Sequence, residues 1–180
     1  KPYITNLYLR FFSTERALVS AYMDKEVESA SNLTPSSARS IERNANILTA
    51  PLTRVFGIFF NQNENELLAH KEVRKALAAS INKDDIIESV LLGYGSRTDG
   101  PLPPSAKEDL IPNEFSSTTL SDVAKSLEKA KWKKNPESDV FEQKTKSSTT
   151  TLAVSLSTAN IPELVESAKR IEESWTALGA

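Results

Sequence analysis

A run of amide side chains follows the most apolar segment of the chain and is the strongest candidate for binding chemistry. The amides belong to Asn61, Gln62, Asn63 and Asn65. Each amide carries both hydrogen-bond donors and an acceptor, so the set can recognise a polar ligand without a net charge. In open α/β sheets, ligands gather outside the ends of strands. We therefore predict ligand binding at these four residues; a plain solvated turn is the alternative.

Residues for ordinary catalysis are scarce in this chain. It has one histidine, His70, and no cysteine, so a catalytic triad or a histidine- or thiolate-rich metal site lacks ligands. The neighbouring carboxylates Asp84 and Asp85 occupy adjacent positions of a predicted helix and do not share a face. Gly93 and Gly95 follow a helix instead of a strand, and the third glycine of a dinucleotide fingerprint is missing. We predict no catalytic residue, no metal site, no cofactor and no enzymatic activity.

Composition narrows the possible partners. The 180 residues carry a net charge of −2, with 39% hydrophobic and 26% charged residues, which is ordinary for a globular chain. Neither a basic patch nor a long apolar run is present, so we expect no nucleic-acid partner and no membrane insertion of this segment. The chain starts directly in a predicted strand without a signal peptide, and we expect it to be a piece of a longer protein.

Strands and helices are expected to alternate along the chain. Thr53–Phe60 is almost continuously apolar, which indicates a strand buried on both faces. Further strands are predicted at Tyr3–Phe12, Val27–Ala30, Asp139–Lys146 and Thr149–Ser157. Helices are predicted after the caps Ser13 or Thr14, Thr34, Asn82 and Ser121, from His70 to Ile81, and from Asn160 to a glycine end at Gly179. This order predicts a single α/β domain over residues 1–180, with a mixed β-sheet and helices on both faces.

Several motifs of the middle and C-terminal parts carry a family resemblance. They are FFN (Phe59–Asn61), VRKALAASINKDDI (Val73–Ile86), SVLLGYG (Ser89–Gly95), GPLPPS (Gly100–Ser105), SDVAKSLEKA (Ser121–Ala130) and the strand-plus-helix unit that ends at Ala180. Together they resemble the family 5 extracellular solute-binding proteins of ABC transporters, the oligopeptide-, dipeptide- and nickel-binding group. The chain departs from the family where Leu67-Leu68 replaces a Pro-Phe pair. It also stops at Ala180, where the family continues.

The resemblance implies a fold, a function and partners. The fold would be one lobe of a type II periplasmic-binding-protein-like fold, the C-terminal, inserted lobe. The function would be that of a substrate-binding component, a lipoprotein of the periplasm or cell exterior. It would capture short peptides or a related small solute between two lobes by hinge closure and deliver them to an ABC transporter permease. The isolated lobe is expected to bind weakly. Arg74 matches the family's arginine, for which we expect a structural role.

Two other classes of function stay open at this point. One is a small α/β enzyme of unknown chemistry, in which His70 would be the leading titrating residue. The other is a stand-alone protein-interaction domain. Loss of a detected activity on replacement of His70 would favour the enzyme, whereas the length of the parent gene would separate an interaction domain from one lobe of a larger protein.

Overall fold

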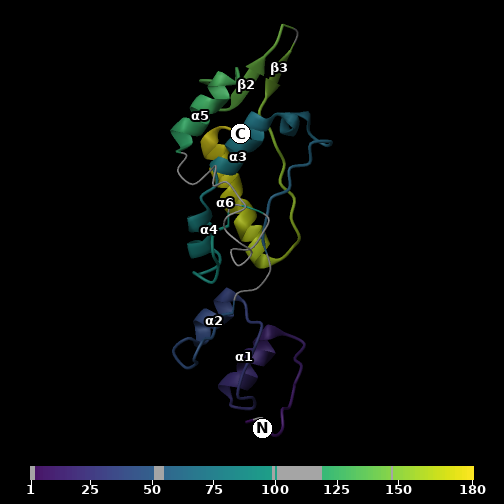
Figure 1. Ribbon diagram of the computed structural model, residues 1–180, viewed down its shortest axis with the longest axis vertical. Helices are drawn as coiled ribbons and strands as arrows, with labels where there is room; N and C mark the ends of the chain where they lie inside the picture. Colours follow the sequence, from purple (N-terminus) through teal and green to yellow (C-terminus); the bar gives the residue numbers. More distant parts are fainter. Residues whose placement is uncertain (1–2, 51–54, 99, 101–118, 147) are drawn as a thin grey trace. The chain divides into compact units, whose positions relative to one another are not determined.

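The chain forms two compact units. The computed structural model describes residues 3–50, 55–98, 100, 119–146 and 148–180, and divides the chain between Ala50 and Pro51. Figure 1 shows both units with their helices and strands. The proline-rich exit loop predicted at Pro101–Pro104 lies outside the described residues, as do Thr53 and the start of its predicted strand.

The first unit is built around two short helices, α1 (Glu15–Met23) and α2 (Pro35–Ile41). Thr14 caps α1, since its hydroxyl accepts a 3.2 Å hydrogen bond from the backbone N–H of Ala17. Thr34 caps α2, with proline at the first helical position, where a missing N–H costs nothing. The Glu15 carboxylate accepts hydrogen bonds from both the backbone N–H and the hydroxyl of Thr34. Both helices were predicted with these caps.

Two strands predicted in the first unit are absent from the structure. Tyr3–Phe12 has no strand assignment, and Tyr3, Tyr8 and Phe11 are almost fully exposed. Val27–Ala30 is likewise irregular. The physical reason is that a strand exists only in pairs, and the described part of this unit contains no second strand to pair with either segment. An aromatic and β-branched composition alone does not provide a second strand with which these segments could pair.

The second unit contains the remaining helices and the sheet. Its helices are the 3₁₀ turn η1 (Glu66–Ala69), α3 (Lys71–Ala79), α4 (Lys83–Ser89), α5 (Leu120–Lys129) and α6 (Pro162–Leu178). The sheet has three antiparallel strands in the order β1 (Lys133–Lys134), β2 (Phe141–Lys144) and β3 (Thr149–Thr151). The β2–β3 hairpin was predicted with longer strands, whereas β1 was not predicted.

Caps explain where these helices begin and end. Thr119, rather than the predicted Ser121, caps α5 in a reciprocal capping box with Asp122. The helix therefore starts two residues earlier than expected. Gly93 after α4 and Gly179 after α6 have φ angles of +84° and +104°, which lie in the left-handed region, and Gly179 ends its helix as predicted.

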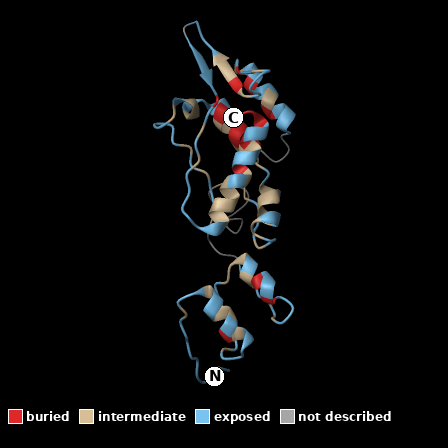
Figure 2. Ribbon diagram, turned by 180° about the vertical axis from the view of Figure 1, so that it is seen from behind, coloured by how far each residue is buried: buried red, intermediate tan, exposed pale blue. Residues whose placement is uncertain are grey.

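One buried cluster joins helices and sheet in the second unit. α3 packs against α5, and Trp175 of α6 donates a 3.0 Å hydrogen bond from its indole N–H to the carbonyl of Leu77. In Figure 2 the buried residues gather around the C-terminus of the chain. The cluster consists of Val73, Ala76, Leu77, Val123, Leu127, Trp132, Phe141, Leu152, Ile171, Trp175 and Leu178. The C-terminal half of α6 is thereby fixed against α3 and β2.

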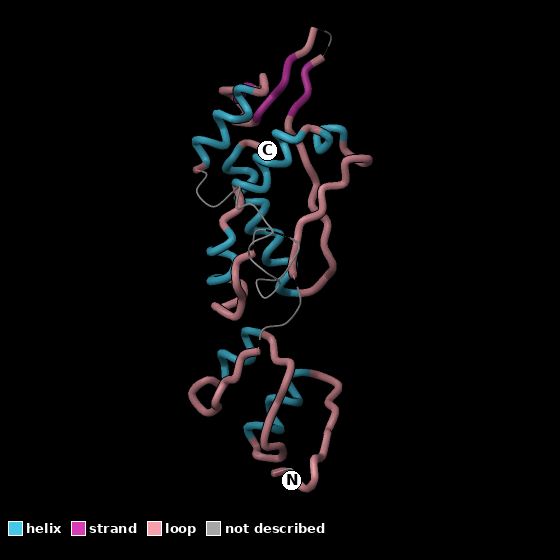
Figure 3. The backbone as a smooth tube through the Cα atoms, viewed as in Figure 1, coloured by secondary structure: helices cyan, strands magenta, loops and turns pink. Residues whose placement is uncertain are grey.

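Residues 55–60, the described part of the strand predicted at Thr53–Phe60, are extended but do not form a strand. Among the described residues, no backbone–backbone hydrogen bond involves residues 55–60, and Phe56 and Phe59 are 56% and 94% exposed. Ile58 and Phe60, by contrast, pack on the core. The prediction that this segment is buried on both faces is therefore wrong. Burial alternates along it, because only one side of the segment contacts helices. A second extended segment, residues 152–157, lies alongside it (Figure 3), and Asn65 Nδ2 donates a 3.2 Å hydrogen bond to the carbonyl of Ala153.

The α/β fold class is confirmed, with six α-helices and a three-stranded sheet among the described residues. The described sheet is antiparallel throughout instead of mixed. Among the described residues, residues 55–60 and 153–157 carry no ladder hydrogen bonds, so they do not join the sheet. Only Leu152, directly after β3, donates from its N–H to the carbonyl of Phe141, at 2.7 Å.

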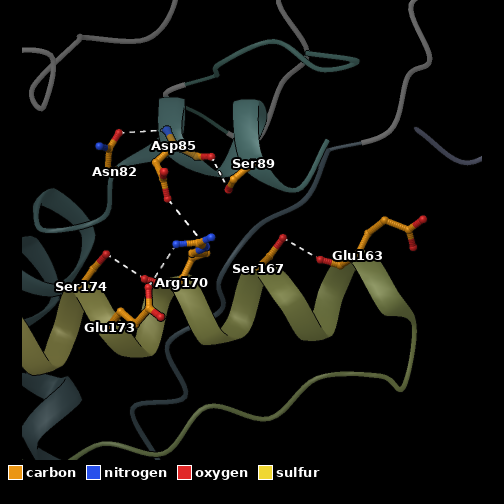
Figure 4. A network of polar contacts seen from close by, with 8 residues as sticks. All are labelled: Asn82, Asp85, Ser89, Glu163, Ser167, Arg170, Glu173 and Ser174. Carbon is orange, nitrogen blue, oxygen red and sulfur yellow. Dashed lines mark hydrogen bonds and ion pairs between the residues drawn. The ribbon is translucent and has the colours of Figure 1, made fainter. Parts of the chain in front are cut away.

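A polar network holds α4 on α6 (Figure 4). Asn82 accepts a 3.1 Å hydrogen bond from the backbone N–H of Asp85 and so caps α4 as predicted. The Asp85 carboxylate does not reach back to Asn82; it faces Arg170, with 4.0 Å between Oδ2 and Nε. Arg170 also pairs with Glu173 at 3.4 Å. These contacts are internal and partly exposed, so they orient α4 and add little stability, at most about 1 kcal/mol per pair.

Candidate functional site

The four predicted ligand-binding residues lie in an exposed turn between the extended segment and η1. Asn61, Gln62 and Asn63 are exposed, and Asn65 is half-buried. The turn forms because Asn61 Oδ1 accepts a 3.1 Å hydrogen bond from the backbone N–H of Asn63, a local Asx turn. Asn65 Oδ1 accepts a 2.9 Å hydrogen bond from the N–H of Leu67 and so caps η1. The structure thus brings the four residues together.

The four amides are not equally available for a ligand. Asn61 and Asn65 use their oxygens in the turn, and Asn65 also donates to Ala153. Gln62 Oε1 lies 3.3 Å from Arg74 Nη1. Within the described part of the chain, the side chain of Asn63 makes no hydrogen bond, so both of its polar groups can meet a ligand.

A pocket lies next to this turn. Its volume is about 250 Å³, and its lining consists of Phe60, Lys71, Arg74, Lys75 and Ala78. The four helical residues come from one face of α3, because positions i, i+3, i+4 and i+7 line up along a helix. Phe60 enters from the extended segment, and its ring stacks on Trp175 with 6.4 Å between centroids. The pocket therefore joins an apolar wall to a row of basic side chains.

Arg74 links the pocket to the turn. Its Nη1 atom donates to the carbonyls of Leu68 at 2.7 Å and Ala69 at 2.9 Å, besides Gln62. These bonds hold the end of η1 against α3, as expected for a structural arginine that bonds neighbouring backbone. Each acceptor is a neutral oxygen, so the positive charge of Arg74 is not cancelled by them.

Sequence reasoning missed the pocket residues Phe60, Lys71 and Lys75. The available signal was the spacing of three basic residues at i, i+3 and i+4 in the first turns of α3. Phe60 could not be added, because its side chain was expected inside a strand covered on both faces. The contact between this segment and α3 depends on packing over Trp175, a residue more than one hundred positions away.

Other kinds of site are not formed by the described residues. They contain no group of three or more His, Asp or Glu side chains that could hold a metal ion. No helix among the described residues is long and apolar enough to cross a membrane. His70 is exposed before α3 and makes no side-chain capping bond.

The turn and the pocket thus lie next to each other in the second unit of an α/β fold. The family described as bacterial extracellular solute-binding proteins, family 5, middle part, matches residues 1–179. The chain belongs to this family. Searches among curated proteins and among solved structures gave no match.

Membership of this family has consequences for the function, partners and location of the protein. The family consists of solute-binding proteins of the kind that serves ABC importers, and such proteins are generally not enzymes. A solute ligand and an ABC transporter permease are therefore the implied partners, and the implied location is periplasmic or extracellular.

Proposed function

We propose that this chain is part of the peptide-binding component of an ABC importer and forms the C-terminal, inserted lobe of a two-lobed protein. Short peptides are captured between this lobe and the other one when a hinge closes. The parent protein is then a lipoprotein anchored at the cell envelope and hands its peptide to the permease. The family match over residues 1–179 carries the proposal of solute binding.

The extended segments favour a peptide over other solutes. Residues 55–60 and 153–157 have no backbone–backbone hydrogen bonds among the described residues, and the carbonyl of Ala153 is bonded only to the side chain of Asn65. A peptide can satisfy backbone N–H and C=O groups by adding as a strand, and its alternate side chains then meet the surface. The amide of Asn63 and the pocket at Phe60 lie at the end of the first segment and can fix the end of the peptide.

Calorimetric titration with trialanine tests the proposal on the parent protein and on the 180-residue chain. A closed pocket buries most of a ligand, whereas one lobe buries about half, so binding to the chain alone should be on the order of 100-fold weaker. Equal affinity for the two proteins would contradict capture between lobes. If the parent binds no peptide of two to five residues, the solute is of another class.

A pair of variants tests the role of the turn. Asn63→Ala in the parent should weaken trialanine binding by about fivefold, the effect of one lost hydrogen bond. Because Asn63 has no side-chain partner in the described structure, the midpoint of urea denaturation should not change. Asn46→Ala is the matched control, since Asn46 is exposed and also has no described side-chain contact. Equal binding by both variants would remove the turn from the site.

A further inference from the structure

We infer that the pocket beside the turn is an anion subsite, in which Lys71 and Arg74 bind an oxyanion of the solute, such as the carboxylate of a peptide C-terminus. The inference rests on the proposed solute-binding function and specifies the chemistry of one end of the solute. It is carried by the charges of the pocket, by its size and by its apolar wall.

Lys71 and Arg74 have no acidic partner among the described residues. Among the described residues, no carboxylate lies within 4 Å of the ammonium group of Lys71 or the guanidinium of Arg74. All hydrogen bonds of Arg74 in the described structure leave from Nη1. Its Nη2 and Nε carry three further N–H donors in the planar arrangement that matches a carboxylate.

Lys71 occupies a position in α3 that is unfavourable for a positive charge. Lys71 is the first residue of α3, where the positive end of the helix dipole disfavours a cation. This effect is unfavourable for Lys71 when the pocket is empty, whereas an anion beside Lys71 would interact favourably with both the lysine and the helix dipole. Residues that contradict the local preferences of a helix in this way occur mainly at functional sites.

The size of the pocket indicates which part of a ligand it takes. At about 250 Å³ it is smaller than the roughly 300 Å³ at which pockets for whole small molecules begin. It therefore accepts one end of a larger solute. Phe60 and Ala78 supply an apolar wall next to the cations, which suits a carboxylate with an apolar group beside it, as in the last residue of a peptide.

The test compares three probes on the full 180-residue chain by NMR titration, which detects millimolar binding. The probes are trialanine, trialanine amide and inorganic phosphate. The amide lacks the terminal carboxylate and should bind at least fivefold more weakly than trialanine. Lys71→Gln should reduce this difference by up to about fivefold, the contribution of one exposed ion pair, and leave the part that is due to Arg74. Salt at 0.5 M should also reduce it, since the pair is screened. Lys133→Gln changes the net charge equally on exposed β1, outside the pocket, and should keep the difference.

Each outcome decides between the inference and the proposed function. Equal binding of trialanine and its amide, unaffected by Lys71→Gln, overturns the anion subsite and leaves peptide binding intact. Phosphate binding that depends on Lys71, without any peptide binding, supports the anion subsite and contradicts the peptide proposal. Absence of shifts with all three probes at 20 mM overturns both.

Discussion

Gly179 is the position at which one added methyl group should disturb the second unit most. Its φ of +104° ends α6, and its carbonyl accepts a 2.8 Å hydrogen bond from the N–H of Phe141 in β2. A Cβ at this position would lie 2.6 Å from the carbonyl oxygen of Asp139 and 3.3 Å from the Phe141 ring. The helix end and the sheet therefore meet at a point that has room only for glycine.

The cost of Gly179→Ala has two parts. The left-handed conformation costs an L-residue about 1–2 kcal/mol. The overlap with a backbone oxygen must be relieved by a backbone shift, and overpacking of this kind costs about 1–3 kcal/mol. The free energy of unfolding should therefore fall by about 2–5 kcal/mol, a large share of the stability of a small domain.

Two other glycines separate these contributions in urea denaturation followed by circular dichroism. Gly93→Ala has a positive φ but no atom within 4 Å of the added Cβ, so it should lose only about 1–2 kcal/mol. Gly57→Ala has neither feature and should change stability by less than about 1 kcal/mol. If Gly179→Ala costs no more than Gly93→Ala, the close approach of α6 to Asp139 is wrong.

Three further predictions concern α3, α5 and α6. Trp175→Phe should lower the free energy of unfolding by about 1–3 kcal/mol in urea, because the buried carbonyl of Leu77 loses its donor. Arg74→Gln should speed amide hydrogen exchange in η1 at least tenfold, because two carbonyls lose a charged donor, whereas unchanged exchange would contradict the bracing role. Hydrogen bonds from Thr119 hold the pKa of Asp122 below its usual range. Its stabilising effect is thus present above the unfolded pKa of about 4 and lost as the pH falls through the lower folded value, so Asp122→Asn should lose less stability than wild type between pH 6 and pH 2.

The helices were predictable because their signals are local. Thr14, Thr34 and Gly179 act as caps or ends within one turn of their own helix, and the structure keeps all three. At α5 the sequence predicted Ser121 as the cap, whereas the reciprocal bonds with Asp122 make Thr119 the cap. Such choices depend on side-chain geometry that a pattern of residue types does not contain.

The strands and the pocket were harder to predict because they depend on distant partners. Tyr3–Phe12 and the segment ending at Phe60 have strand composition, yet neither finds a pairing strand among the described residues. The turn at Asn61–Asn65 could be located from its residue types alone. The pocket beside the turn could not be located in this way, because Phe60 reaches α3 only through packing on Trp175.

The binding surface itself can be tested by one measurement. Backbone amide shifts of the 180-residue chain are recorded by NMR during titration with trialanine to 20 mM. The account predicts that the largest shifts fall on residues 55–63, on residues 71–78 of α3 and on residues 153–157, with little change in α5 or the β2–β3 hairpin. Shifts centred on α5 and the hairpin, or no shifts at all, would contradict the placement of the solute at the turn and its pocket.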